Sequence, residues 1–141
     1  MTKRNKIIYW AVTGFLAFGM LSQSFAQTLH SKGYVDILVH LGYPTYLLTI
    51  LGIWKALGVA ALLVPGFPLL KEWAYAGFFF AMSGALISHI TVDDPAIASA
   101  PALLLLTLTV VSWYFRPADR KVISANEEKR QHYGQEREVI A

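Results

Sequence analysis

The sequence predicts an all-α membrane protein: a four-transmembrane-helix up-down bundle with a short interfacial helix on its outer side. Hydrophobic residues make up 55% of the 141 residues and charged residues only 15%, against about 25% charged residues in soluble domains. The mean hydropathy is +0.46, and a soluble domain of this composition would expose large apolar patches. The basic residues gather near the two ends of the chain, as they do beside membrane spans. We therefore predict contact with the lipid bilayer and no nucleic-acid partner.

Four apolar stretches make up the predicted transmembrane domain, residues 1–121, and a polar tail follows at residues 122–141. A helix rises about 1.5 Å per residue, so roughly 20 residues cross a hydrocarbon core of about 30 Å. The fourth stretch reaches that length only if its helix begins at Pro95, with Asp94 as the N-cap and Pro101 inside it. The predicted spans are residues 7–26, 46–64, 73–90 and 95–115.

The first stretch also resembles a secretory signal peptide. A basic start and an apolar run precede Ser24 and Ala26, small residues at the −3 and −1 positions before Gln27. The run is longer than the usual apolar core of about 7–15 residues, and it contains Tyr9 and Trp10. We therefore expect this segment to stay attached as the first helix.

The positions of the basic residues predict the orientation. Nine of the twelve Lys and Arg residues precede the first span or follow the fourth, and Lys71 lies in the short connection at residues 65–72. By the positive-inside rule both termini are cytoplasmic, and residues 27–45 and 91–95 lie outside. We predict a multi-pass protein of the cell (inner) membrane.

Small residues repeat at every fourth position in the second and third spans: Gly52, Ala56, Ala60; Gly77, Ala81, Ala85. Such faces let membrane helices approach closely, although Gly and Ala are also common in membrane helices generally. The short connections make neighbouring helices antiparallel. Residues 34–41 have the spacing of an interfacial helix closed by Gly42 and Pro44. The tail contains a capping-box pattern, Ser124 to Glu127, and predicts a frayed helix or disorder.

Lys55 is the main candidate for chemistry because it lies nine positions from each end of residues 46–64, near the bilayer midplane. A central lysine costs about 2.5–3.5 kcal/mol on insertion, so we expect it to point into the bundle. The hydroxyl residues Thr107, Ser83 and Thr13 lie nearer to its depth than Glu72 does, and no carboxylate lies at its level. Lys55 either loses its proton, donates to these hydroxyls and a ligand, or acts as a structural hydrogen-bond donor. Trp54 either lines a pocket or faces lipid.

Two further groups of polar residues lie near the span ends. Glu72 begins the third predicted span, where a carboxylate either complements the positive helix end or serves a coupling or docking role. At the outer side His89 and Asp93 have i, i+4 spacing, with Asp94, His30 and His40 nearby. This arrangement fits a hydrogen-bonded helix-end histidine, a proton-entry path or a metal site. We assign no metal ligand and no catalytic residue.

Several short sequences resemble the DoxX-like family of small four-helix membrane proteins. They are residues 41–44 (LGYP), 51–58 (LGIWKALG), 70–77 (LKEWAYAG) and the Arg116-Pro117 pair. The resemblance covers residues 7–121 and implies the four-helix fold and a membrane location. Relatives in the wider superfamily are linked to thiosulfate:quinone oxidation and redox complexes, and one animal branch acts as a receptor-assembly chaperone. The family offers no catalytic set to carry over.

Three functions remain open from the sequence. The first is binding of a small lipophilic molecule such as a quinone together with a redox partner, which would make the chain a component of a quinone-linked oxidoreductase. Its ligand-binding residues would be Lys55, Trp54, Thr107, Ser83 and His89. The alternative is a membrane chaperone or a non-catalytic subunit of a membrane complex, with a protein partner or a second copy of the chain. Transport would require dimerisation, because four helices lack paired broken helices.

Overall fold

Helices are the only regular elements among the described residues. The computed structural model describes residues 2–140, except for the side chains of residues 123–126 and 128. The α-helices are α1 (Lys3–Thr28), α2 (Lys32–His40), α3 (Leu47–Leu63), α4 (Pro68–Thr91), α5 (Ala96–Tyr114) and α6 (Val122–Ile140), and a 3-10 turn, η1, covers Ala118–Arg120. The predicted all-α class is confirmed.

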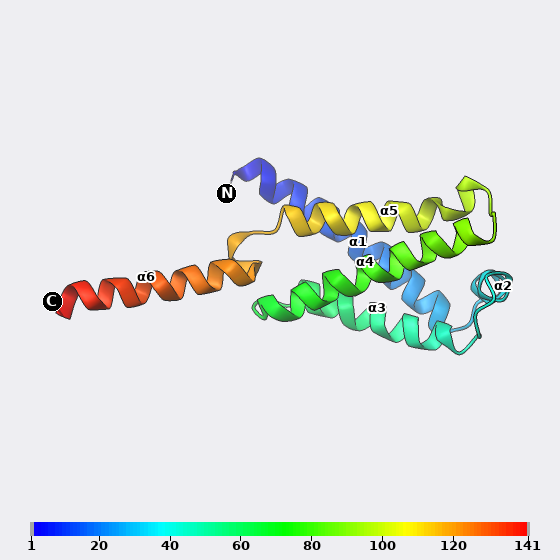
Figure 1. The fold of residues 1–141 in the computed structure, drawn as a ribbon, viewed down its shortest axis with the longest axis horizontal. Helices are drawn as coiled ribbons and strands as arrows, with labels where there is room; N and C mark the ends of the chain where they lie inside the picture. The colour runs from blue at the N-terminus through cyan, green and yellow to red at the C-terminus, as the bar shows by residue number, and fades with distance from the viewer. Residues whose placement is uncertain (1, 141) are drawn as a thin grey trace.

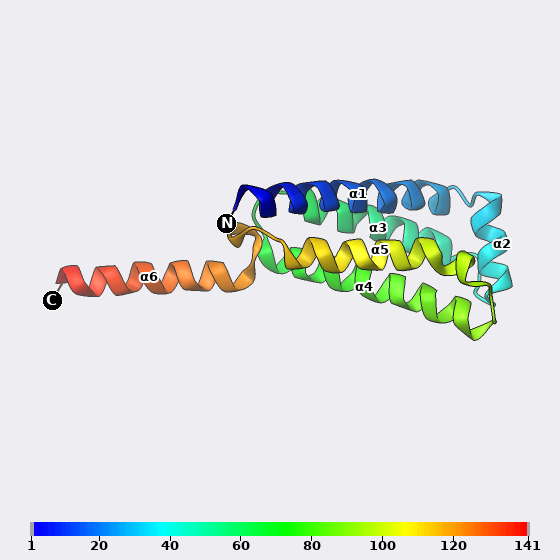
Figure 2. The same cartoon turned by 90° about the horizontal axis from the view of Figure 1, so that it is seen from above.

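Four helices, α1, α3, α4 and α5, pack side by side. α1 contacts α3 and α5, and α4 also contacts α3 and α5, so the four form a ring in the order α1–α3–α4–α5 (Figures 1 and 2). Consecutive members run in opposite directions, as their short connections require. α2 lies across one end of the ring, and α6 extends away from the other end (Figure 2).

The two ends of this ring differ in their charged residues. The start of α1, the first turn of α4 and the end of α5 with η1 lie together. They bring Lys3, Lys71, Arg116 and Arg120 to what we call the basic end. The opposite end holds α2 and the α4–α5 connection, with His30, His40 and His89, and we call it the histidine end.

Three of the four helices, α1, α4 and α5, are long and apolar enough to cross a membrane, and α3 is a shorter apolar helix. Large apolar side chains on their outward faces are exposed, including Phe15, Phe18, Trp54, Phe80 and Leu104. An exposed apolar surface of this kind fits contact with a lipid bilayer.

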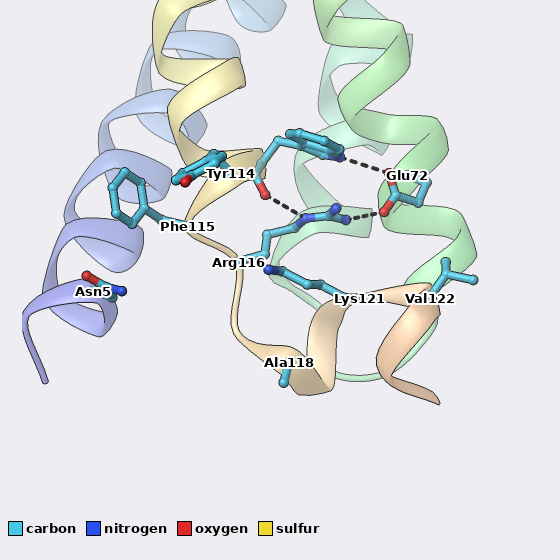
Figure 3. Close-up of a pocket in the computed structure, with 9 residues that line it drawn as sticks. Asn5, Glu72, Tyr114, Phe115, Arg116, Ala118, Lys121 and Val122 are labelled. Carbon is cyan, nitrogen blue, oxygen red and sulfur yellow. Dashed lines mark hydrogen bonds and ion pairs between the residues drawn. The ribbon is translucent and has the colours of Figure 1, made fainter. Parts of the chain in front are cut away.

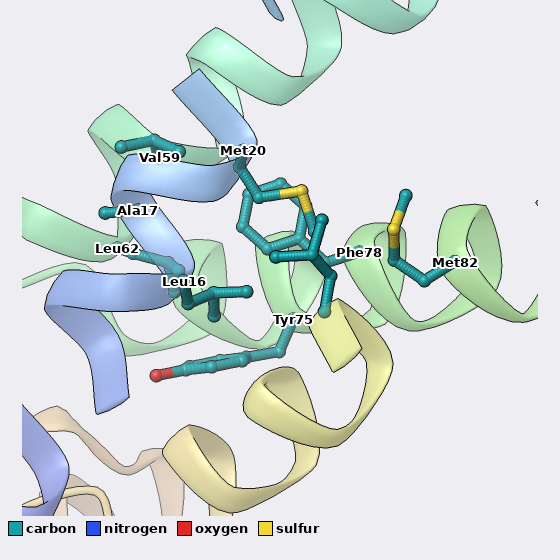
Figure 4. Packing of buried hydrophobic residues seen from close by; sticks show 9 residues of the cluster. Leu16, Ala17, Met20, Val59, Leu62, Tyr75, Phe78 and Met82 are labelled. Atoms are coloured by element: carbon teal, nitrogen blue, oxygen red, sulfur yellow. The ribbon is translucent and has the colours of Figure 1, made fainter. Parts of the chain in front are cut away.

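The interior contains one hydrophobic cluster that joins all four helices (Figure 4). Its members are Leu16, Ala17 and Met20 of α1, Val59 and Leu62 of α3, Tyr75, Phe78 and Met82 of α4, and Leu105 of α5. Polar and charged side chains are buried around this cluster, including Thr13, Lys55, Lys71 and Ser112. The buried faces are therefore partly polar while the exposed faces are apolar, which suits an apolar surrounding.

α4 contains the third predicted span, residues 73–90, and begins five residues before it. The helix begins at Pro68, because proline suits the first turn of a helix, where its missing N–H is not needed. Phe67 precedes it in a left-handed conformation with φ of 51°. Lys71 and Glu72 therefore lie inside α4 and not in the connection.

One helix end differs from the sequence prediction. Pro95, not Asp94, is the N-cap of α5, and no side-chain cap forms there. The tail forms α6, which agrees with the helical alternative of the two that were expected, a frayed helix or disorder. The predicted capping box falls on Ser124, whose side chain lies outside the described residues. The predicted interfacial helix is present as α2 and ends before Gly42, which has the expected positive φ of 82°.

The small-residue faces have different roles on α3 and α4. A Cβ at Gly52 would clash with Thr28 Oγ1 and lie 2.9 Å from the Ser24 carbonyl oxygen, so this glycine lets α3 approach α1. Gly77 of α4 has nothing within 4 Å of the same position. The close-approach prediction is thus right for Gly52 and wrong for Gly77, which borders an open groove.

Candidate functional site

Lys55 points into the ring and is only 4% exposed. It belongs to the buried stripe of α3, one helical turn after Gly52. Its Nζ donates to Gln23 Oε1 at 2.6 Å and to Gln27 Oε1 at 3.1 Å, both on α1. The predicted inward direction is confirmed, and both partners are neutral carboxamides.

The hydroxyl partners expected for Lys55 were wrong. Thr107 donates to the Leu103 carbonyl oxygen, and Ser83 donates to the Phe80 carbonyl oxygen, each within its own helix. Depth along the bundle places residues at one level but does not say which face of a helix they occupy. The glutamine spacing of i, i+4 on α1 is the sequence feature that predicts the observed pair, because it puts two polar groups on one face.

A groove lies between α3 and α4, with a cavity volume of about 440 Å³. Its lining is mainly apolar: Leu51, Trp54, Leu57, Gly58, Ala61, Leu70, Trp73, Ala74, Gly77, Phe78 and Ala81, with Lys55 as the one charged residue. Trp54 is 66% exposed at the rim, so it both lines the groove and faces outward. The volume and the apolar lining suit a small lipophilic molecule.

A second polar cluster joins α1, α4 and α5 nearer the basic end. The Ser112 Oγ lies 2.7 Å from both Thr13 Oγ1 and the Tyr75 hydroxyl. The Tyr9 hydroxyl is buried, and among the described residues it has no hydrogen-bond partner. Hydrogen bonds between membrane helices stabilise their packing, so we assign this cluster a structural role.

Glu72 joins α4 to the end of α5 (Figure 3). Its Oε1 lies 2.6 Å from Arg116 Nη1, and its Oε2 accepts a 3.0 Å hydrogen bond from Trp113 Nε1. The Arg116 guanidinium also donates from Nε to the Trp113 carbonyl oxygen and lies over the Tyr75 ring. The prediction that Glu72 complements the end of its own helix was wrong, because α4 begins a full turn earlier.

Two cations cap the end of α3 at the basic end. The fully buried Lys71 donates to the Ala61 and Val64 carbonyl oxygens, and Arg120 Nη1 donates to the Leu62 carbonyl oxygen at 2.8 Å. The last carbonyls of a helix have no partner within the helix and carry partial negative charge. Lys71 and Arg120 satisfy them and are therefore engaged within the fold.

Asp94 joins two histidines at the histidine end. His89 donates from Nδ1 to Oδ2 at 2.7 Å, and His40 donates from Nε2 to Oδ1 at 2.6 Å. These hydrogen bonds, first from His89 and then from His40, lower the pKa of the Asp94 carboxyl. The predicted i, i+4 pairing of His89 with Asp93 was wrong. α4 ends at Thr91, and Asp93 adopts a left-handed conformation with φ of 56°.

The histidines do not converge on a metal centre in the described part of the chain. His30 is bonded instead to Thr49, with Nε2 and Oγ1 2.8 Å apart. No group of three or more His, Cys, Asp or Glu residues there could hold a metal ion. His89 thus fits the helix-end interpretation, and it does not line the groove beside Lys55.

The comparison with protein families identifies the same family as the motifs at residues 41–77 did. The sequence model of the DoxX-like family matches residues 11–112, which run from within α1 to near the end of α5. No curated protein and no solved structure matches the chain significantly. The chain belongs to the DoxX-like family.

Proposed function

We propose that this protein binds a small lipophilic molecule such as a quinone in the α3–α4 groove and works with a redox partner. The observation that carries the proposal is the groove itself. It has a volume of about 440 Å³, an apolar lining and a single charged residue, Lys55. Apolar pockets with a few polar groups are the usual sites for such ligands.

Lys55 supplies the polar contact in this proposal. Its Nζ donates to the carboxamide oxygens of Gln23 and Gln27, and among the described side chains it pairs with no carboxylate. An uncompensated ammonium in an apolar interior is a strong hydrogen-bond donor to a carbonyl oxygen. Trp54 and Phe78 line the same groove and offer aromatic faces to a quinone ring.

The proposed ligand set is narrower than the sequence suggested. Lys55 and Trp54 remain in it, whereas Thr107, Ser83 and His89 are absent from the groove lining. The sequence has no cysteine and thus no thiol–disulfide couple. Electrons for a bound quinone would therefore come from the redox partner.

Four helices of the ring cross the cell (inner) membrane in this proposal, with both termini on the cytoplasmic side. α3 has 17 residues, which extend for about 25 Å at about 1.5 Å per residue and need slight bilayer thinning or flanking residues to complete the span. The gathering of basic residues at the end that holds the N-terminus supports the orientation.

The second candidate is a non-catalytic subunit or chaperone in a membrane complex. It is favoured by α6, which lies beyond the matched family region, extends away from the ring and exposes Tyr133, Val139 and Ile140. A helix placed in this way is available to a protein partner or a second copy of the chain.

Quinone titration tests the first candidate. Decylubiquinone added to the detergent-purified protein should quench tryptophan fluorescence saturably, because Trp54 and Trp73 line the groove. Lys55→Met should abolish the saturable quenching, and Gly77→Leu should do the same by filling the groove. Lys32→Met is the matched control, since Lys32 is exposed on α2 and pairs only with Asp36.

The outcomes separate the two candidates. Saturable binding that survives both Lys55→Met and Gly77→Leu would show that the groove is not the site. Absence of quinone binding by the unaltered protein, together with a stable partner recovered by crosslinking to α6, would favour the subunit function.

A further inference from the structure

A polar cavity of about 610 Å³ lies at the basic end, away from the Lys55 groove. Its lining comes from the starts of α1, α4 and α6 and from the end of α5 with the turn that follows: Asn5, Glu72, Trp113, Tyr114, Phe115, Arg116, Ala118, Lys121 and Val122. The cavity therefore lies where four chain segments meet at the basic end.

Two cations and one carboxylate face this cavity. Arg116 is only 5% exposed and pairs with Glu72. Lys121 forms no ion pair with any of the described side chains. Arg116 and Lys121 both line the cavity (Figure 3). Because Glu72 pairs with Arg116, Lys121 leaves the lining with a net positive charge, which attracts an anion. Asn5 offers an amide donor from the same lining.

An apolar groove adjoins the polar cavity. The groove lies between α4 and α5, has a volume of about 320 Å³, and shares Glu72 and Trp113 with the polar cavity. Its other lining residues are Tyr75, Ala76, Phe79, Phe80, Thr109 and Val110. The Glu72–Trp113 hydrogen bond thus lies at the border between a charged compartment and an apolar one, which follows α4 and α5 away from the basic end.

Aromatic side chains mark the level of the polar cavity. Trp113, Tyr114 and Phe115 line it, and Trp10 lies under the Arg120 guanidinium at the same end. Trp and Tyr gather at the head-group level of a bilayer, and basic pockets between membrane helices bind anionic lipid head groups. A free phosphate ion would fill the polar compartment and leave the apolar groove without an occupant.

We infer that the basic end binds one anionic phospholipid, with its phosphate beside Lys121 and Arg116 and an acyl chain in the α4–α5 groove. The lipid bridges α1, α4, α5 and the start of α6. This site is separate from the Lys55 groove, so its test does not depend on quinone binding.

Thermal unfolding of the full chain in neutral detergent tests the inference with three probes. Phosphatidylglycerol should raise the unfolding midpoint, whereas phosphatidylcholine and inorganic phosphate should not. Lys121→Gln should weaken the phosphatidylglycerol effect, requiring about fivefold more lipid for the same shift, as expected for one lysine near an anionic surface. Lys129→Gln removes the same charge from exposed α6 and should change nothing.

A second variant tests the acyl groove without touching the charges. Ala76→Phe fills the α4–α5 groove and should weaken the response to phosphatidylglycerol as Lys121→Gln does. Equal stabilisation by inorganic phosphate would overturn the lipid assignment in favour of a free anion site. Equal responses to the two phospholipids, or a response unchanged by both Lys121→Gln and Ala76→Phe, would overturn the site.

Discussion

The Lys55 ammonium on α3 donates a 3.1 Å hydrogen bond to the Gln27 carboxamide oxygen on α1, and both side chains are buried. This contact lies beside the close approach of the two helices at Gly52, where Ser24 Oγ donates to the Gly52 carbonyl oxygen at 2.6 Å. The buried amino group is therefore held in the interior by neutral acceptors, so its contact with α1 depends on hydrogen bonds and not on an ion pair.

Removal of one acceptor should destabilise the fold more than removal of the charge. Gln27→Leu leaves the Lys55 ammonium short of an acceptor and should cost about 1–3 kcal/mol of unfolding free energy. Lys55→Met should cost less, because the buried charge disappears as well. The Lys55→Met, Gln27→Leu double variant should be more stable than Gln27→Leu alone. Loss of helical circular dichroism in dodecyl sulfate measures each value, and strictly additive effects would contradict a direct contact.

Gly52→Ala should separate α1 from α3. The added methyl group would meet a backbone oxygen at 2.9 Å, which cannot move without shifting the helix, and overpacking of this kind costs about 1–3 kcal/mol. Gly77→Ala is the matched control, because its methyl group enters open space and alanine favours the helix. In the same unfolding assay, Gly52→Ala should have a lower unfolding free energy than the unaltered protein, and Gly77→Ala an equal or higher one. Equal stability of the two variants would argue against the tight α1–α3 contact.

Lowering the pH should destabilise the fold by protonating Asp94 at the histidine end. Hydrogen bonds from His89 and His40 hold the folded-state pKa of Asp94 below the ordinary value of about 3.9. A lowered folded-state pKa means that the stabilisation is present above about pH 4 and is lost as the pH falls through the folded-state value. Asp94→Asn should therefore flatten the fall of the thermal midpoint below about pH 4. Asp93→Asn should leave the pH dependence of the thermal midpoint unchanged. The same pH dependence in both variants would contradict the assignment of the effect to Asp94.

The membrane topology can be tested on a cysteine-free background, because the sequence contains no cysteine. Ser31→Cys and Tyr133→Cys place single thiols near opposite ends of the ring, before α2 and on α6. An impermeant maleimide added to intact cells should label Ser31→Cys, and Tyr133→Cys should react only after lysis. Labelling of both variants in intact cells would refute the proposed orientation.

The sequence predicted correctly those features that depend on a single helix and not on its neighbours. The apolar stretches predicted the four ring helices, and the inward direction of Lys55 followed from the cost of a charge in hydrocarbon. Gly42 was correctly identified as the end of the short interfacial helix, because a positive φ is a local property. Boundaries were less certain: Pro68 starts α4 within a segment whose Lys71 and Glu72 resemble a charged connection.

The sequence by itself determined an all-helical membrane protein of the DoxX-like family with a buried lysine in its second apolar stretch. Only the tertiary structure decided that Lys55 pairs with Gln27, that Glu72 pairs with Arg116, and that Asp94 rather than Asp93 receives the histidines. Hydropathy and helical rise give the depth of each side chain along the bundle, but contacts between helices also require the rotation of each helix about its axis. That rotation is set by the packing of all four helices together, through close approaches such as that of Gly52 to α1.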